Sequence, residues 1–210
     1  AGLSYGLATF AMPQARSTLS DVQATTLLFG AFYLILTVRE ALERVRQPAY
    51  HHLMLAGACL GMAFLTRLVT APAILVLVIA MLVVLVGAHK RWAASTNSQL
   101  RLQCLAFVSP ALLGFGLYLF FNYARFGDAL ESGYGAAVSL DGFWKYPMAL
   151  GLVSLCLAPG KGLLFLAPAL VLVPKGWMNV ENRVAGFTRW VILAVTIAVF
   201  APIVGLETWH

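Results

Sequence analysis

A lysine stands between helix-breaking residues in the middle of a long apolar stretch. Residues 150–174 are almost entirely apolar but are interrupted by Pro159, Gly160, Lys161 and Gly162. In hydrocarbon, a charge and irregular backbone are tolerated only where they line a cavity or where the break lies at the membrane surface. Glycines beside a lysine can also expose backbone N–H groups to an anion, to which the ammonium adds positive charge. Lys161 is therefore the first candidate for a functional site.

A second group of polar side chains follows the apolar run that ends near residue 121. The sequence NYARFGDALESGYG places Arg125, Asp128, Glu131 and Tyr134 close together. Two carboxylates can act as general acid and general base when their environments separate their pKa values. A surface cluster of salt bridges is the alternative interpretation, and the spacing alone does not decide between the two.

Three further charged residues lie in short connections between apolar runs. Arg67 stands in FLTRLVTAP, where almost no loop is present to solvate it. Such an arginine either extends its charge to the membrane surface or binds a lipid phosphate there. Asp21 follows Ser20 at an expected helix start, where a carboxylate complements the positive end of the helix. Arg16 pairs with Asp21 across the turn, or both face a ligand.

The composition excludes a soluble globular protein. Hydrophobic residues make up 61% of the 210 positions, charged residues 10%, and the mean hydropathy is +0.86. These values are typical of membrane proteins with several spans. The net charge of +6 is explained by loops that contact anionic lipid headgroups, and no nucleic-acid partner is expected because no basic run alternates with aromatic residues. The three cysteines lack metal-ligand spacing and the histidines form no two-histidine-one-acid pattern, so no metal site is predicted.

The lengths of the apolar runs predict an all-α fold, a polytopic transmembrane helix bundle in a single domain over residues 1–210. We expect six to seven spans, of which one is broken, near residues 1–13, 22–38, 53–66, 69–88, 102–121, 148–174 and 190–206. The first is expected to be the tail of a span that begins outside the sequence. Gly57 and Gly61 form a GxxxG pattern, for which packing within one bundle is predicted and dimerisation is the alternative.

The basic residues divide unequally between the two sides of these spans. Nine fall on one side and five on the other. The larger group is Arg39, Arg44, Arg46, Lys90, Arg91, Arg101, Lys175, Arg183 and Arg189, and the smaller is Arg16, Arg67, Arg125, Lys145 and Lys161. Because cytoplasmic loops carry the excess of Lys and Arg, the side with nine is predicted to be cytoplasmic. The candidate residues above then share the outer side.

Three stretches taken together resemble one enzyme family. They are residues 15–36, residues 57–76, and the pair FNYARFGDALESGYG and LAPGKGLLFLAPALVL. In order and spacing they are similar to the polyprenyl-phosphate-dependent glycosyltransferases of the type C membrane fold, which include bacterial relatives of the protein mannosyltransferases and the lipid A aminoarabinose transferase. The pair resembles the family's Asn-Tyr-x-Arg-Phe-Gly segment and its Ser-Pro-Gly-Lys-Gly turn, with Ala158 in place of the serine.

The resemblance implies an enzyme of the bacterial cytoplasmic (inner) membrane that takes a sugar from a polyprenyl phosphate at the non-cytoplasmic face. By this analogy Lys161, Arg67 and Arg125 contact the donor phosphate, and Asp21 with Arg16 borders the sugar. A cationic clamp suits a phosphate leaving group, whose developing negative charge needs compensation. The family's catalytic carboxylate lies in an outer loop expected before the sequence given. The chain is therefore expected to be the middle of a longer protein.

Two other classes of function remain open. A non-catalytic accessory or structural subunit would keep the same bundle and pack against other membrane subunits. A transporter or lipid-binding scaffold would also have a broken helix with a charge inside the membrane, although no inverted repeat is found. Membrane lipids and a polyprenyl-phosphate sugar are the partners implied by the leading hypothesis, and the sequence leaves a requirement for a divalent cation open.

Overall fold

The computed structural model of the chain describes residues 20–44, 48–91, 97–130, 151, 153, 157 and 183–204. Within these ranges the regular structure is helical and no strand occurs. The predicted all-α class is confirmed for this part of the chain. Residues 23–133 form one compact unit, and the helix at 183–204 belongs to a second unit.

The helices follow the apolar runs of the sequence. They are α3 (Ser20–Glu43), α4 (Tyr50–Thr66), the short 3₁₀ helix η1 (Leu68–Thr70), α5 (Ala71–Arg91), α6 (Asn97–Phe126) and α11 (Arg183–Val204). Pro72 lies in the first turn of α5, where the missing N–H removes no helical hydrogen bond. The predicted segments at 1–13 and most of 148–174 lie outside the described residues.

Three helical segments are long and apolar enough to cross a membrane. They are Val22–Glu43, Leu68–Lys90 and Asn97–Phe126, with 22, 23 and 30 residues. At 1.5 Å per residue even the shortest measures about 33 Å, against a hydrocarbon thickness of about 30 Å. Two shorter apolar helices are Tyr50–Thr66 and Gly186–Val199. These segments indicate an integral membrane protein.

Both faces of α5 are apolar, but only one is buried. Ala73, Leu77, Met81 and Leu85 are at most 1% exposed, whereas the opposite stripe of Leu75, Ile79, Val83 and Val86 is 39–61% exposed. A soluble helix would carry polar residues on its outer stripe. An exposed stripe of branched aliphatic side chains is instead suited to contact with lipid tails.

The closest helix contact in the described part of the chain joins α4 to α6 through glycines. A Cβ added to Gly57 would lie 2.0 Å from the carbonyl oxygen of Phe107, and one added to Gly61 would lie 2.9 Å from that of Pro110. From the other side, a Cβ on Gly114 would lie 2.5 Å from the Cα of Gly61. The GxxxG pattern therefore lets two backbones meet inside one unit, and the prediction of packing within one bundle is confirmed.

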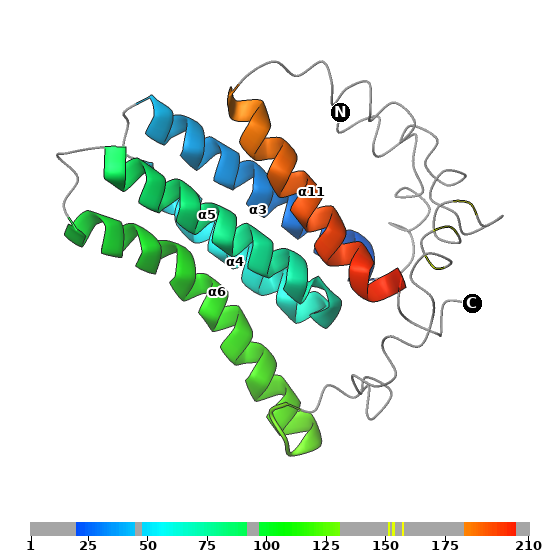
Figure 1. Cartoon of the computed structure of the whole chain (residues 1–210). Helices are drawn as coiled ribbons and strands as arrows, with labels where there is room; N and C mark the ends of the chain where they lie inside the picture. The colour runs from blue at the N-terminus through cyan, green and yellow to red at the C-terminus, as the bar shows by residue number, and fades with distance from the viewer. Residues whose placement is uncertain are drawn as a thin grey trace. The chain divides into compact units, whose positions relative to one another are not determined.

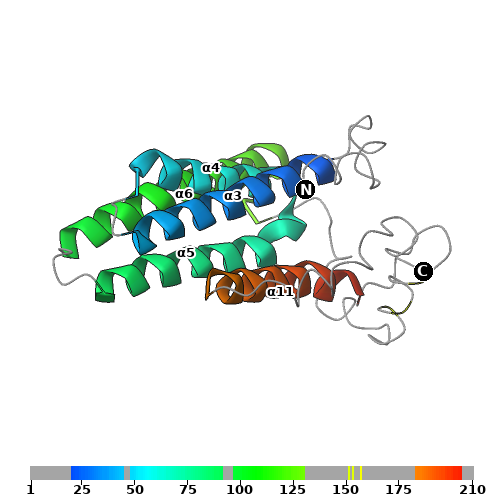
Figure 2. The ribbon, with the colours of Figure 1, turned by 90° about the horizontal axis from the view of Figure 1, so that it is seen from above.

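The α4–α6 contact also fixes the direction of the two helices. Gly57 meets Phe107, and further along both helices the Phe64 ring lies 4.9 Å from the Tyr118 ring, centroid to centroid. The residue numbers increase in the same direction along both helices, so α4 and α6 run parallel. α5, which lies between them in the sequence, runs antiparallel to both. Figures 1 and 2 show the three helices side by side.

α6 bends in the middle, as Figure 1 shows. Pro110 lies inside this helix and has no N–H to donate to the preceding turn. Its ring also crowds the carbonyl four residues earlier, which is the usual cause of a helix kink. The bend occurs beside the glycine contact with α4, and the last turns of α6, beyond the contact of Tyr118 with Phe64, extend away from α4 and α5.

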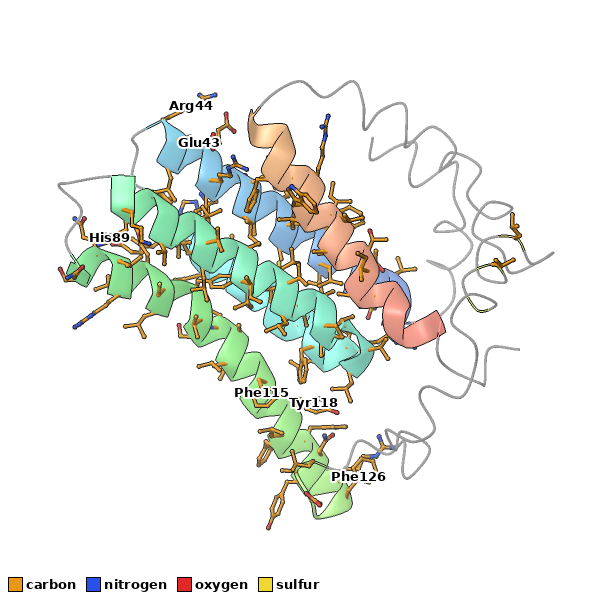
Figure 3. All side chains as sticks on the ribbon, in the orientation of Figure 1. Glu43, Arg44, His89, Phe115, Tyr118 and Phe126 are labelled. Carbon is orange, nitrogen blue, oxygen red and sulfur yellow. The ribbon has the colours of Figure 1, made fainter. Side chains whose placement is uncertain are left out.

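Polar residues gather at the two ends of this unit. α3 and α5 end, and α4 and α6 begin, at one end, where Figure 3 labels Glu43, Arg44 and His89. The opposite end holds Arg67, in the turn between α4 and α5, and Arg125, in the last turn of α6, where Figure 3 labels the neighbouring Phe126. The helices thus alternate in direction, as expected for consecutive spans.

Candidate functional site

Arg67 lies at the corner where α4 ends and the chain turns into α5. Its backbone is extended, with φ −154° and ψ 122°, so the α-helix cannot continue through it. The Arg67 N–H still donates to the Ala63 carbonyl at 3.1 Å, and the Arg67 carbonyl accepts from the Thr70 N–H at 3.2 Å. The corner is therefore closed by backbone hydrogen bonds on both sides of the arginine.

Two threonine hydroxyls complete this corner. The Thr66 Oγ1 donates to the Ala63 carbonyl at 2.7 Å, and the buried Thr70 Oγ1 lies 2.6 Å from the Arg67 carbonyl and 3.2 Å from that of Ala63. Backbone carbonyls at a helix end need such partners when water is excluded. The hydroxyls hold the turn in one conformation and fix the point from which the half-buried Arg67 side chain leaves the backbone.

The end of α6 is formed by a glycine and an asparagine. Gly127 has φ +77°, a left-handed conformation that suits glycine after a helix end, and its N–H donates to the Tyr123 carbonyl at 2.9 Å. The Asn122 side chain is 3% exposed, and its Nδ2 donates to the Ala129 carbonyl at 3.4 Å. The chain is thereby folded back over the last turn of α6.

Asp128 and Arg125 belong to the same helix end but make different contacts. The Asp128 Oδ1 accepts the Leu130 N–H at 2.9 Å, which is a local turn of the kind that aspartate favours. The Arg125 guanidinium carbon lies 5.1 Å from the centroid of the Phe126 ring, within the range of a cation–π contact, and its side chain is exposed. These two residues form no ion pair with each other in the described part of the chain. A salt bridge between them is thus not what organises this segment.

Arg67 and Arg125 lie toward the same end of the unit at different distances along it. The Phe64 ring packs between those of Phe115 at 5.4 Å and Tyr118 at 4.9 Å, which sets the level at which α4 approaches α6. Arg125 follows Tyr118 by seven residues and so stands about 10 Å further along α6. Figure 3 shows Phe126, its neighbour, well beyond Tyr118. The two arginines therefore share one end of the unit.

The other predicted site residues are less completely described. Asp21 lies in the first turn of α3, as expected, but its side chain is outside the described part of the structure. Arg16, Glu131, Tyr134 and Lys161 all lie outside the described residues. Their assigned roles stay predictions.

Two polar residues that organise this end were not singled out from the sequence. Asn122 could have been identified from the sequence, because an amide directly after two phenylalanines in an apolar run needs an internal hydrogen-bond partner. Thr70 had a weaker signal, since threonine is common in apolar segments and often donates only to its own helix. Among the described residues no group of three or more His, Cys, Asp or Glu side chains could hold a metal ion.

A comparison of the chain with protein-family models, with curated proteins and with solved structures finds no match in any of the three.

Proposed function

We propose that the chain belongs to a membrane-embedded glycosyltransferase that takes a sugar from a polyprenyl phosphate at the non-cytoplasmic face. In this proposal the protein lies in the bacterial cytoplasmic membrane and has six to seven spans, one of them broken at Lys161. The sugar donor and the surrounding lipids are its partners.

One observation carries the proposal among the described residues. Arg67, at the α4–α5 corner, and Arg125, at the end of α6, lie toward one end of a parallel helix pair. The opposite end carries the basic residues of the predicted cytoplasmic side, including Lys90 and Arg101. The two arginines are therefore suited to contact a lipid-borne anion in the leaflet that the positive-inside rule assigns to the outside.

The two arginines suit a phosphate in different ways. Arg67 leaves a corner whose backbone is held by three side-chain hydrogen-bond contacts, so its position is well defined. Arg125 is exposed beside an aromatic ring, where a lipid phosphate can approach it from the headgroup region. Guanidinium groups bind phosphate oxygens in a two-pronged geometry that an ammonium cannot match.

In the proposed reaction an acceptor hydroxyl attacks the anomeric carbon of the sugar, and the bond from that carbon to the phosphate oxygen breaks. The polyprenyl phosphate leaves with the electron pair, and its new negative charge is compensated by Lys161, Arg67 and Arg125. The hydroxyl proton passes to a carboxylate base. Asp21 and Arg16 border the sugar, and Glu131 and Tyr134 remain candidates for contacts with it. Asp128 keeps its structural role at the helix end.

The first experiment measures binding of polyprenyl phosphate without sugar to the purified chain in detergent. Arg67→Gln and Arg125→Gln are each expected to weaken binding at least about tenfold, because each removes charged hydrogen bonds to the phosphate. Arg44→Gln removes the same charge at the opposite end, where Arg44 pairs with Glu40, and should leave the affinity unchanged. Equal affinity for all three variants and the parent would refute the clamp.

The second experiment measures transfer of radiolabelled hexose from a polyprenyl phosphate by the full-length protein. Lys161→Ala is expected to abolish transfer while leaving the protein folded. Transfer at the parental rate would remove Lys161 from the mechanism. Binding of the lipid without any transfer, together with stable co-purification of other membrane subunits, would favour the accessory-subunit alternative.

A further inference from the structure

The end of the unit opposite Arg67 and Arg125 collects basic groups from all four helices. They are Arg39 on α3 and Arg44 directly after it, His51 and His52 on α4, His89 and Lys90 on α5, and Arg101 on α6. The helix order places these residues together, since α3 and α5 end where α4 and α6 begin. Figure 3 shows Arg44 and His89 at this end.

Carboxylates balance only part of this charge. Arg39 Nε pairs with Glu43 Oε1 at 2.8 Å, and Arg44 Nη2 pairs with Glu40 Oε1 at 2.5 Å, both one helical turn apart. Four Lys and Arg side chains against two Glu leave a net charge of +2 on the side chains described there, with the histidines neutral.

Lys90 and Arg101 carry the charge that the glutamates leave unbalanced. Both side chains are exposed, and neither forms an ion pair with a carboxylate in the part of the chain that the structure describes. They stand on two helices that contact each other, α5 and α6, on either side of the connection between them. The His89 Nε2 lies 3.1 Å from the Asn97 Oδ1 and links these helix ends.

The apolar lengths place these cations at the headgroup level. In α5 the residues from Ala71 to Ala88 carry no charge and measure about 27 Å along the axis, close to the hydrocarbon thickness. Lys90 follows this run after His89. In α6 the long uncharged run begins directly after Arg101, so Arg101 stands at its edge.

We propose that Lys90 and Arg101, with the exposed His51 beside them on α4, form a docking surface for anionic phospholipid headgroups. The occupant follows from charge complementarity and from depth, because the cations lie where a bilayer presents phosphates. This surface lies at the opposite end from the proposed sugar-donor site. Lipid binding here therefore does not depend on whether the protein transfers a sugar.

The test titrates dihexanoyl phosphatidylglycerol into the purified chain in a zwitterionic detergent, with dihexanoyl phosphatidylcholine as the neutral comparison. The parent should bind the anionic lipid more tightly, and its affinity should fall as ionic strength rises. Lys90→Gln and Arg101→Gln should each lower that affinity about fivefold. Because both side chains are exposed, the variants should melt at the parental temperature.

A charge-conserving control separates charge from shape. The double variant Lys90→Arg, Arg101→Lys should keep the preference for the anionic lipid. Equal binding of both lipids by the parent, or unchanged affinity in the two glutamine variants, would overturn the proposal.

Discussion

The glycine contact between α4 and α6 makes a quantitative prediction for Gly57→Ala. The added Cβ would lie 2.0 Å from the Phe107 carbonyl oxygen. Ordinary contact begins at 3.4 Å, so the two backbones must separate by about 1.4 Å at this point. Neither partner is a flexible side-chain end that could rotate away. We therefore expect a loss of about 1–3 kcal/mol in the free energy of unfolding, the usual range for overpacking.

The measurement is reversible unfolding by sodium dodecyl sulfate in mixed micelles, followed by circular dichroism. Two matched controls are available in the same fold, because a Cβ on Gly87 or Gly116 would meet no atom within 4 Å. Alanine there removes the entropic cost of a helical glycine, so these variants should be neutral or more stable by up to about 1 kcal/mol. A Gly57→Ala protein as stable as Gly87→Ala would refute the direct backbone contact.

Two further predictions concern the ends of the helices. Thr70→Val should lower the free energy of unfolding by about 1 kcal/mol, since it removes the hydroxyl 2.6 Å from the Arg67 carbonyl, and Thr70→Ser should restore most of the loss in the same assay. Gly127→Ala should cost about 1–2 kcal/mol at φ +77° and speed amide hydrogen exchange in the last turn of α6, whereas unchanged exchange there would contradict the left-handed helix end.

The sequence predicted where the helices lie but set their ends too close to the apolar runs. α6 was expected at residues 102–121 and extends over Asn97–Phe126. An apolar run measures the part of a helix in hydrocarbon, while the backbone hydrogen bonds continue into the headgroup region. At the end of α3, the pairs Arg39–Glu43 and Glu40–Arg44 stabilise one more turn than hydropathy indicates.

The helix over the predicted span at residues 53–66 does not extend past the C-terminal end of that span. α4 begins earlier than this predicted span, at Tyr50. It stops at Thr66 because Arg67 adopts an extended backbone that the two threonine hydroxyls stabilise. That conformation depends on which carbonyls meet which hydroxyls after the turn, and hydropathy does not contain this information.

The candidate site could be predicted as a set of outer-side charges but not as a geometry. The alternation of spans correctly placed Arg67 and Arg125 at a common end of the described unit. The alternation could not predict that the Asp128 carboxylate accepts a hydrogen bond from the Leu130 N–H, because that contact requires the left-handed turn at Gly127. Nor could it show the bend in α6 carrying Arg125 away from the α4–α5 corner.

The Asn-Tyr-x-Arg-Phe-Gly segment has a structural explanation that changes the weight of its resemblance to a glycosyltransferase family. Asn122 and Gly127 are both needed to end α6, one through its contact with the Ala129 carbonyl and the other through its left-handed φ. Any protein ending a helix in this way could select these two residues without sharing a reaction. Arg125 is different, because its exposed guanidinium contacts only the neighbouring Phe126 ring among the described groups, and the helix end does not require it. Within this segment, the case for a phosphate-binding function therefore depends on the arginine.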